Sequence, residues 1–301
     1  MNTVGYVRLL RSLAGALTAV AVAMSLAVFL GLGRFGATEA AVTAVTGSSA
    51  IYFMTFFLLA STLLTLTLPA HVPRLILLLG VFPLLIGWRI SVLADLFWIQ
   101  VPCVLAFAVF VLLFLLIAVH DLRSEPKPGR IKPTLPYIQL AFIRLYIGLD
   151  LVPHFTEKLF AGPATRADDV QAFQQLGVPD PLQFVLLAGV IEFSAAFGVG
   201  LGFLTRTACI LTVVYLMVAT IMGHHFLLGF IWASPGGGWE YPLLWSVLIL
   251  SFAIGSGRWM SLDEVLSGFL RLPRWVKALM GDTASHANGR IHISRAGADA
   301  P

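Results

Sequence analysis

Long apolar runs alternate with short polar or basic stretches along the whole chain. A membrane-spanning helix needs about 20 apolar residues, and eight runs approach that length. They cover residues 14–32, 49–68, 74–94, 97–119, 137–160, 182–204, 206–230 and 241–256. The third run is the weakest, because Arg89 and Asp95 interrupt or flank it. The pattern predicts an all-α fold, a polytopic membrane helix bundle with about eight transmembrane helices.

Composition places the chain in the same class. Of its residues, 58% are hydrophobic and 11% are charged, whereas soluble domains contain about 25% charged residues. The first run exceeds the roughly 7–15 apolar residues of a signal peptide. We therefore predict an uncleaved first helix, with a cleaved signal as the alternative. Cys103 and Cys209 lie inside apolar runs without a C-x-x-C pair, which argues against dithiol chemistry.

Basic residues mark one end of the predicted bundle. They precede the first span, follow the fourth, separate the sixth from the seventh, and follow the eighth. The residues are Arg8, Arg11, Arg123, Lys127, Arg130, Lys132, Arg206, Arg258, Arg271, Arg274 and Lys277. The positive-inside rule assigns this end to the cytoplasm, so we predict cytoplasmic N- and C-termini. Because the charge of +4 lies in loops and tails, it does not indicate a nucleic-acid partner.

The chain divides into four predicted parts. They are an N-terminal four-helix membrane half (1–123), a cytoplasmic linker (124–136), a second four-helix membrane half (137–270), and an interfacial segment with a disordered tail (271–301). Arg11-Ser-Leu-Ala-Gly15 resembles Arg144-Leu-Tyr-Ile-Gly148, and further short similarities follow in the same order. They favour a parallel internal repeat, although apolar sequences also resemble one another by chance.

The fifth span carries five ionisable side chains in an otherwise apolar setting, namely Arg144, Asp150, His154, Glu157 and Lys158. Each costs about 2.5–3.5 kcal/mol in hydrocarbon, so the span needs partners or a wet cavity. The last four share spacings of four, three and one, which predict a single helix face. Pro153 lies among them and is expected to bend the helix there.

Other polar residues are expected near the outer end of this face. Glu192 lies near the centre of the sixth span and needs a cation or a proton; Arg144 and Lys158 are the available cations. His224 or His225 ends the seventh span. Outer loop 161–181 contains a short helix that starts with acidic residues and forms either a lid or a plain connector.

Glu240 begins the eighth span, where a carboxylate also suits the helix dipole. Trp239 and Tyr241 beside it are interfacial anchors. We select as candidate catalytic residues Asp150, His154, Glu157, Lys158, Glu192, His224 and Glu240. We select as candidate cofactor-binding residues Arg144, Trp239 and Tyr241. No metal ligands are selected.

Several motifs resemble the DoxX family of bacterial membrane proteins. They are Arg144-Leu-x-x-Gly148, Glu157-Lys158, Phe173-x-x-Leu-Gly-Val-Pro179, Glu192, Gly202-x-x-Thr-Arg206, His224, Gly238-Trp-Glu-Tyr-Pro242 and Gly255-x-Gly-Arg-x-x-Ser-Leu-Asp263. The resemblance covers about residues 137–266. It implies a four-helix unit in the bacterial cytoplasmic (inner) membrane, related to the DoxD and DoxX subunits of thiosulfate:quinone oxidoreductase. The additional N-terminal half departs from that compact form.

The resemblance implies a subunit or accessory of a quinone-linked oxidoreductase, with quinone as the cofactor. The chain contains no C-x-x-C, haem-attachment motif or nucleotide-binding glycine fingerprint. Electrons are therefore expected from a protein partner that carries the redox centre, or directly from substrate. The alternatives are a transporter-like module and a purely structural subunit whose buried charges set helix register. A haem or metal site at His154 and His224 is a further possibility, but no ligand spacing supports it.

Overall fold

The computed structural model describes residues 3–125, 133–254 and 259–281, and within these ranges all regular secondary structure is helical. The first half consists of α1 (Thr3–Phe29), α2 (Glu39–Thr46), α3 (Ala50–Thr67), α4 (Pro73–Leu93) and α5 (Phe97–Arg123). The second half consists of α6 (Leu135–Leu149), α7 (Val152–Leu159), α8 (Pro163–Gln175), α9 (Pro181–Ala195), the π-helical turn η1 (Ala196–Gly200), α10 (Thr205–Met222) and α11 (Glu240–Ile254). Two short helices follow, α12 (Leu262–Phe269) and α13 (Arg274–Met280).

The chain is a multi-pass membrane protein. In the described residues, seven helical spans are long and apolar enough to cross a membrane. The eighth predicted span corresponds to α11, an apolar helix that is shorter within the described part of the chain. The linker at 126–132 and the tail at 282–301 lie outside the described residues, so the predictions made for them stay predictions.

Three predicted spans have different ends in the structure. The first helix starts at Thr3 and not at residue 14. The seventh was predicted to reach residue 230, but α10 ends at Met222 because Gly223 caps it and His224 takes a left-handed conformation, with φ +59°. The fifth span is divided into α6 and α7, and Pro153 lies in the first turn of α7, where its missing N–H is tolerated.

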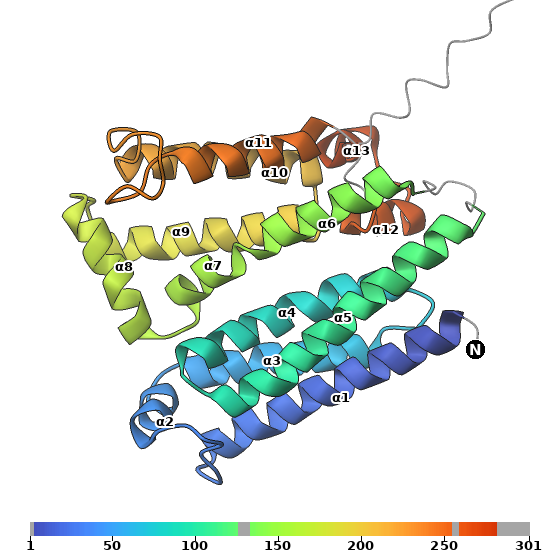
Figure 1. Ribbon diagram of the computed structural model, residues 1–301, viewed down its shortest axis with the longest axis horizontal. Helices are drawn as coiled ribbons and strands as arrows, with labels where there is room; N and C mark the ends of the chain where they lie inside the picture. Colours follow the sequence, from blue (N-terminus) through green and yellow to red (C-terminus); the bar gives the residue numbers. More distant parts are fainter. Residues whose placement is uncertain (1–2, 126–132, 255–258, 282–301) are drawn as a thin grey trace, which may run out of the picture.

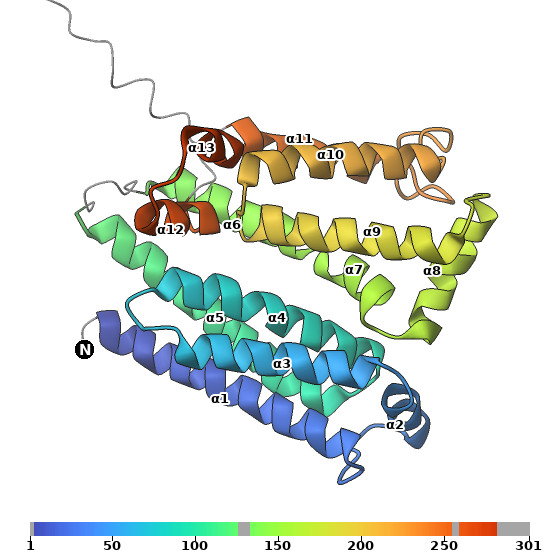
Figure 2. The same cartoon turned by 180° about the vertical axis from the view of Figure 1, so that it is seen from behind.

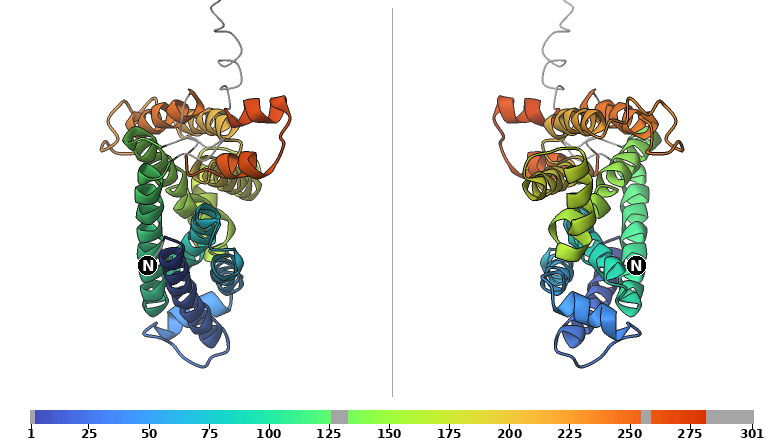
Figure 3. Two further views of the ribbon diagram at one scale, coloured as in Figure 1. Left: turned by 90° about the vertical axis from the view of Figure 1, so that its right-hand side faces the viewer. Right: turned by 90° about the vertical axis from the view of Figure 1, so that its left-hand side faces the viewer.

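The two halves lie side by side, with their long helices running in the same general direction (Figures 1 and 2). In the first half, α1 packs against α3 and α5, and α4 packs against α3 and α5. In the second half, α9 packs against α7 and α10, while α11 packs against α6 and α10. The short helices α2 and α8 lie at the same end of the molecule, opposite α12 and α13 (Figure 1). End-on views show the two groups stacked without intertwining (Figure 3).

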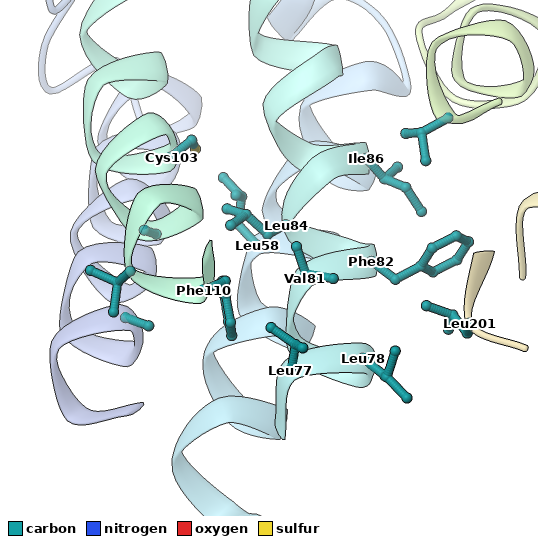
Figure 4. Close-up of a cluster of buried hydrophobic side chains, with 14 of the residues drawn as sticks. Leu58, Leu77, Leu78, Val81, Phe82, Leu84, Ile86, Cys103, Phe110 and Leu201 are labelled. Carbon is teal, nitrogen blue, oxygen red and sulfur yellow. The ribbon is translucent and has the colours of Figure 1, made fainter. Parts of the chain in front are cut away.

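Helix α4 is the most buried of the candidate spans, with 67% of its apolar window inside the protein. Phe82 contacts the rings of Phe155, Phe193 and Phe197 in the second half, with centroids 6.2, 5.6 and 5.7 Å away. Figure 4 shows Phe82 directed toward Leu201, whereas Val81 and Leu77 lie nearer Phe110 of α5. Helix α4 therefore forms the main contact between the halves.

Ion pairs fasten both ends of this contact. Arg74, at the start of α4, pairs with Asp121 of α5 and with Glu264 of α12, both at 2.5 Å. Arg89, near the end of α4, pairs with Glu157 of α7. Arg89, which made this run the weakest of the predicted spans, is therefore neutralised by a carboxylate of the second half.

Candidate functional site

A buried ion pair joins α7 to α9. Lys158 Nζ lies 3.1 Å from Glu192 Oε2, and the two side chains are only 11% and 9% exposed. Tyr215 of α10 donates its hydroxyl proton to Glu192 Oε1 at 2.7 Å. We call these three residues the intramembrane cluster. Of the two cations expected for Glu192, the structure pairs it with Lys158.

Close packing of α7 on α9 explains how the pair is buried. Gly189 lies one turn before Glu192, and a Cβ there would meet Leu159 Cγ and Lys158 Cβ at 2.8 and 3.0 Å. Lys158 Nζ also donates to the carbonyl oxygen of His154 at 3.1 Å. Small residues let membrane helices approach closely. Gly189 therefore allows α7 to come near enough to α9 for Lys158 to pair with Glu192.

Helix α8 packs against α7 and α9 at one end of the cluster. Arg166 donates from Nε to the carbonyl of Lys158 at 2.5 Å, which fixes α8 to the end of α7. Asp169, one turn later, is half-buried, and its Oδ2 is buried without a hydrogen bond among the described residues. Burial raises the pKa of Asp169, while Lys158 lowers it and the nearby Glu157 and Glu192 raise it. The predicted loop helix thus brings a carboxyl group to the cluster.

Glu157 and Lys158 point to different neighbours, although they are adjacent in sequence. Adjacent helix residues are about 100° apart, so Lys158 faces α9 while Glu157 faces Arg89 of α4. His154 is exposed, and Asp150 lies before α7, in the break that follows α6. The prediction that these four residues form one face is therefore wrong, because Asp150 lies outside α7, and Glu157 and Lys158 face different helices.

Arg144 lies on α6 and is hydrogen-bonded to backbone carbonyls, not to the cluster. Its side chain is fully buried and donates to the carbonyls of Val199 and Gly200 at 2.8 and 2.6 Å, and to the carbonyl of Met260 at 2.6 Å. The first two carbonyls belong to the π-helical end of α9, where helix carbonyls need outside donors. Arg144 therefore binds and fixes backbone carbonyls, and its role in cofactor binding stays a prediction.

Two motifs that are distant in sequence meet beside the Arg144 side chain. Asp263 accepts hydrogen bonds from the backbone N–H groups of Leu204 and Thr205, both at 2.8 Å, and from the Thr205 hydroxyl at 2.7 Å. Gly202 has φ +70°, and a Cβ there would meet Arg144 Nη1 at 2.7 Å. Several residues of the DoxX resemblance thus have a structural function at this junction.

The remaining candidates lie in the hairpin between α10 and α11. His224 is exposed, and the half-buried His225 places Nδ1 3.0 Å from the Gly237 carbonyl. Glu240 accepts from the backbone N–H of Trp232 at 3.1 Å. The ring of Trp239 meets Phe230 edge-on and lies tilted against Phe226, and the ring of Tyr241 meets Trp232 edge-on. These contacts stay within the hairpin, so the described structure does not bring the residues to the intramembrane cluster.

Sequence reasoning did not select three residues that pair with or lie near the candidate residues, namely Arg89, Asp169 and Tyr215. Arg89 interrupts an apolar run, which was a usable signal, and Asp169 was noticed only as part of a helix start. Tyr215 lies in a uniform apolar span and gives no signal. Within the described ranges, no three His, Cys, Asp or Glu side chains are grouped so that they could hold a metal ion; the roles of the candidate residues stay predictions.

A groove lies between the halves, next to the Arg89–Glu157 pair. Its volume is about 690 Å³, and its walls come from α4, α5, α6 and the start of α7. Most lining side chains are apolar or aromatic, among them Trp88, Phe110 and Phe142, and its polar members are Arg89, Tyr146 and Asp150. We call it the inter-half groove.

Comparison with known proteins supports the expected family for part of the chain. Residues 139–225 match the sequence model of the DoxX family. Inner membrane protein YphA of Escherichia coli (strain K12) is 37% identical over 57 residues, which are 19% of this chain and 41% of that protein. The chain thus matches about two fifths of this relative's length. No solved structure matches the chain. The second half of the chain therefore carries a DoxX-family segment, residues 139–225, which contains Lys158, Glu192 and Tyr215.

Proposed function

We propose that the protein is the membrane subunit of a quinone-linked oxidoreductase and exchanges protons through the intramembrane cluster. The observation that carries the proposal is the buried Lys158–Glu192 pair with the Tyr215 hydroxyl on Glu192. Ionisable groups are costly inside a membrane and commonly mark proton or ligand paths. The redox context is what the resemblance to the DoxX family implies, and residues 139–225 match that family.

The chemistry requires both protons and electrons. A quinone becomes a quinol by taking up two electrons and two protons. The cluster offers three proton-exchanging groups in hydrogen-bond or ion-pair contact, and Asp169 on α8 gives a half-buried carboxyl between them and the end of the bundle. Because the sequence has no redox-centre motif of its own, we propose that a partner protein supplies the electrons.

The location follows from the same family context. The matched relative is named an inner membrane protein, and we propose the bacterial cytoplasmic (inner) membrane for this chain. The end that carries the start of α1, α12 and α13 is proposed to face the cytoplasm, because the basic residues cluster there. Asp169 and the hairpin between α10 and α11 then face outward.

Matching contacts in the two halves favour an internal repeat. Arg11 of α1 donates to the carbonyl of Leu68 at the end of α3, as Arg144 of α6 does at the end of α9. In the first half, hydroxyl pairs join α1 to α3, for example Ser25 to Thr55 at 2.8 Å. In the second half, the corresponding contact between α7 and α9 is the ion pair. We propose that the halves are related and that the second has kept the chemistry.

Two alternatives receive less support. A transporter needs a polar path through the bundle, but Arg144, the candidate on its inner half, is engaged by backbone carbonyls. A structural subunit would use the buried pair to set helix register only. The alternatives and our proposal predict different effects of substituting Glu192 on the activity of the complex.

The test is a mild-detergent purification of the full chain from its host, followed by identification of bound proteins and quinones. We expect a redox-centre partner and quinone to copurify, and Glu192→Gln to change the pH dependence of quinone reduction by the complex. The matched control neutralises the exposed pair Arg34–Glu39, whose side chains are 63% and 77% exposed. Normal assembly with unchanged pH dependence in Glu192→Gln would favour the structural alternative.

A further inference from the structure

A row of three side chains on α6 lines the inter-half groove. Phe142, Tyr146 and Asp150 follow one another at intervals of four residues, and all three belong to the lining. Asp150 caps the last turn of α6, where its backbone N–H donates to the carbonyl of Tyr146 at 2.9 Å. Residues four apart share a helix face, so a row of aromatic rings ends in a carboxyl group.

Asp150 differs from the other acidic residues of this region. Glu157 pairs with Arg89 and Glu192 pairs with Lys158, whereas the carboxylate of Asp150 has no ion pair or hydrogen bond among the described residues. The side chain is half-buried, and its carboxylate oxygens are accessible at the surface of the chain. Ionisable groups in membrane segments are costly and commonly mark ligand sites. The groove is where a counter-charge has access to Asp150.

The charges that line the groove leave one negative charge uncompensated. Arg89 is neutralised by Glu157, Asp150 carries the remaining charge, and the other lining side chains are uncharged. An anion would be repelled from this site. A cation with two charges would keep one of them unpaired in an apolar setting, which is costly. A monovalent cation is therefore the charge that the groove matches.

Aromatic rings form much of the groove wall. The lining includes Trp88, Phe107, Phe110, Phe114, Phe142 and Tyr146. Ring faces attract cations, and cages of aromatic rings recognise quaternary ammonium groups. A small, strongly hydrated ion would lose its water shell among these rings. The wall therefore favours a large, weakly hydrated cation.

The groove opens on the outer faces of the helices. Phe142 and Tyr146 are 58% and 63% exposed, and in a multi-pass membrane protein such apolar helix faces meet lipid. The volume of about 690 Å³ lies within the range of about 300–1,000 Å³ for small-molecule sites. A ligand that enters from the bilayer needs an apolar body in addition to its charge.

We propose that the inter-half groove binds a small, monovalent, lipophilic cation. Its charged centre pairs with Asp150, and its apolar groups lie against the aromatic walls. A zwitterionic phospholipid is a poorer match, because its phosphate would bring a negative charge next to Asp150. The site goes beyond the quinone-linked function and does not rest on it, since the intramembrane cluster takes no part in the binding.

The test measures binding of tetraphenylphosphonium to the full chain in phosphatidylcholine nanodiscs, by equilibrium dialysis with empty nanodiscs as the blank. Tetraphenylborate has nearly the same shape and the opposite charge, so it separates recognition of charge from apolar binding. Asp150→Asn removes the charge and keeps the size of the side chain, and Asp168→Asn makes the same change at an exposed position of α8.

A second pair of variants tests the location. Val111→Trp narrows the groove from an α5 position that is 42% exposed, and Val20→Trp makes the same change on α1, away from the groove, at 50% exposure. Because both positions are exposed, neither variant overpacks the core.

We expect the wild type to bind tetraphenylphosphonium saturably and to show no saturable binding of tetraphenylborate. Asp150→Asn should weaken binding of the cation about tenfold or more, because an ion pair in an apolar groove is lost. Val111→Trp should abolish the binding. Asp168→Asn and Val20→Trp should bind as the wild type does.

Equal binding of the two ions by the wild type would overturn the proposal, and this comparison needs no variant to fold. Unchanged binding of the cation in Asp150→Asn or Val111→Trp would also overturn it. So would the absence of saturable binding by the wild type, including the case in which native mass spectra show a retained phospholipid that the cation does not displace. The quinone-linked function is tested separately by copurification, so it stands or falls independently of these results.

Discussion

Removing Lys158 alone tests the central electrostatic feature of the protein. In Lys158→Met, Glu192 loses a cation 3.1 Å away while its side chain stays 9% exposed. At an effective dielectric constant of about 20, a pair at this distance interacts by about 5 kcal/mol. Loss of one partner of a buried pair costs about 3–5 kcal/mol, because the remaining charge is uncompensated. We therefore expect Lys158→Met to lower the free energy of unfolding by about that amount.

The double variant separates the pair from its parts. Lys158→Met combined with Glu192→Gln removes both charges, and the glutamine carbonyl can still accept the Tyr215 hydroxyl. Neutral replacement of a buried pair is commonly close to neutral in stability, so the double variant should be more stable than Lys158→Met alone. Equilibrium unfolding of the purified protein in mixed micelles, followed by tryptophan fluorescence, gives the four free energies of the cycle.

The exposed pair Arg34–Glu39 serves as the control cycle, because exposed pairs contribute about 0–1 kcal/mol. The reasoning is refuted if Lys158→Met unfolds with wild-type stability. It is also refuted if the double variant loses the sum of the two single losses, since the residues would then be uncoupled.

Three further predictions concern single positions. Gly148→Ala should destabilise the protein by about 1–3 kcal/mol in thermal unfolding, because the new Cβ would collide with the Gly200 backbone. The control Gly268→Ala has open space around the new Cβ and should stabilise the helix by up to about 1 kcal/mol. Arg144→Met should lower unfolding stability by about 3 kcal/mol or more, since three buried carbonyls lose a charged donor. Asp169 has a raised pKa, so the folded state keeps a proton that the unfolded chain has released, and stability should fall as pH rises through the window between the usual aspartate pKa and the raised one. Melting curves against pH should flatten in Asp169→Asn but not in Asp168→Asn.

Much of the fold is readable from the chain. Apolar runs of membrane length predicted the long helices, and Pro153 predicted a bend in the fifth span, which the structure divides into α6 and α7 just before this proline. The need to neutralise Glu192 predicted a cation, and Lys158 was one of the two named. These inferences succeed because the bilayer imposes length and charge requirements that act on each segment separately.

The site is only partly readable. The sequence placed Asp150, His154, Glu157 and Lys158 on one face, but the break between α6 and α7 separates Asp150 from the others, and the 100° between adjacent helix residues turns Glu157 and Lys158 toward different helices. It also included His224 and Glu240, which stay in their own hairpin because α10 ends at Met222.

By itself, the sequence determined that this is a membrane helix bundle with buried charges in its second half that require partners. Only the tertiary structure decided which partners they have. Arg144 binds backbone carbonyls, Lys158 binds Glu192, and Arg89 reaches across from the first half to Glu157. The physical reason is that spacing along one helix sets which residues share a face, whereas the partner of that face depends on how separate helices pack.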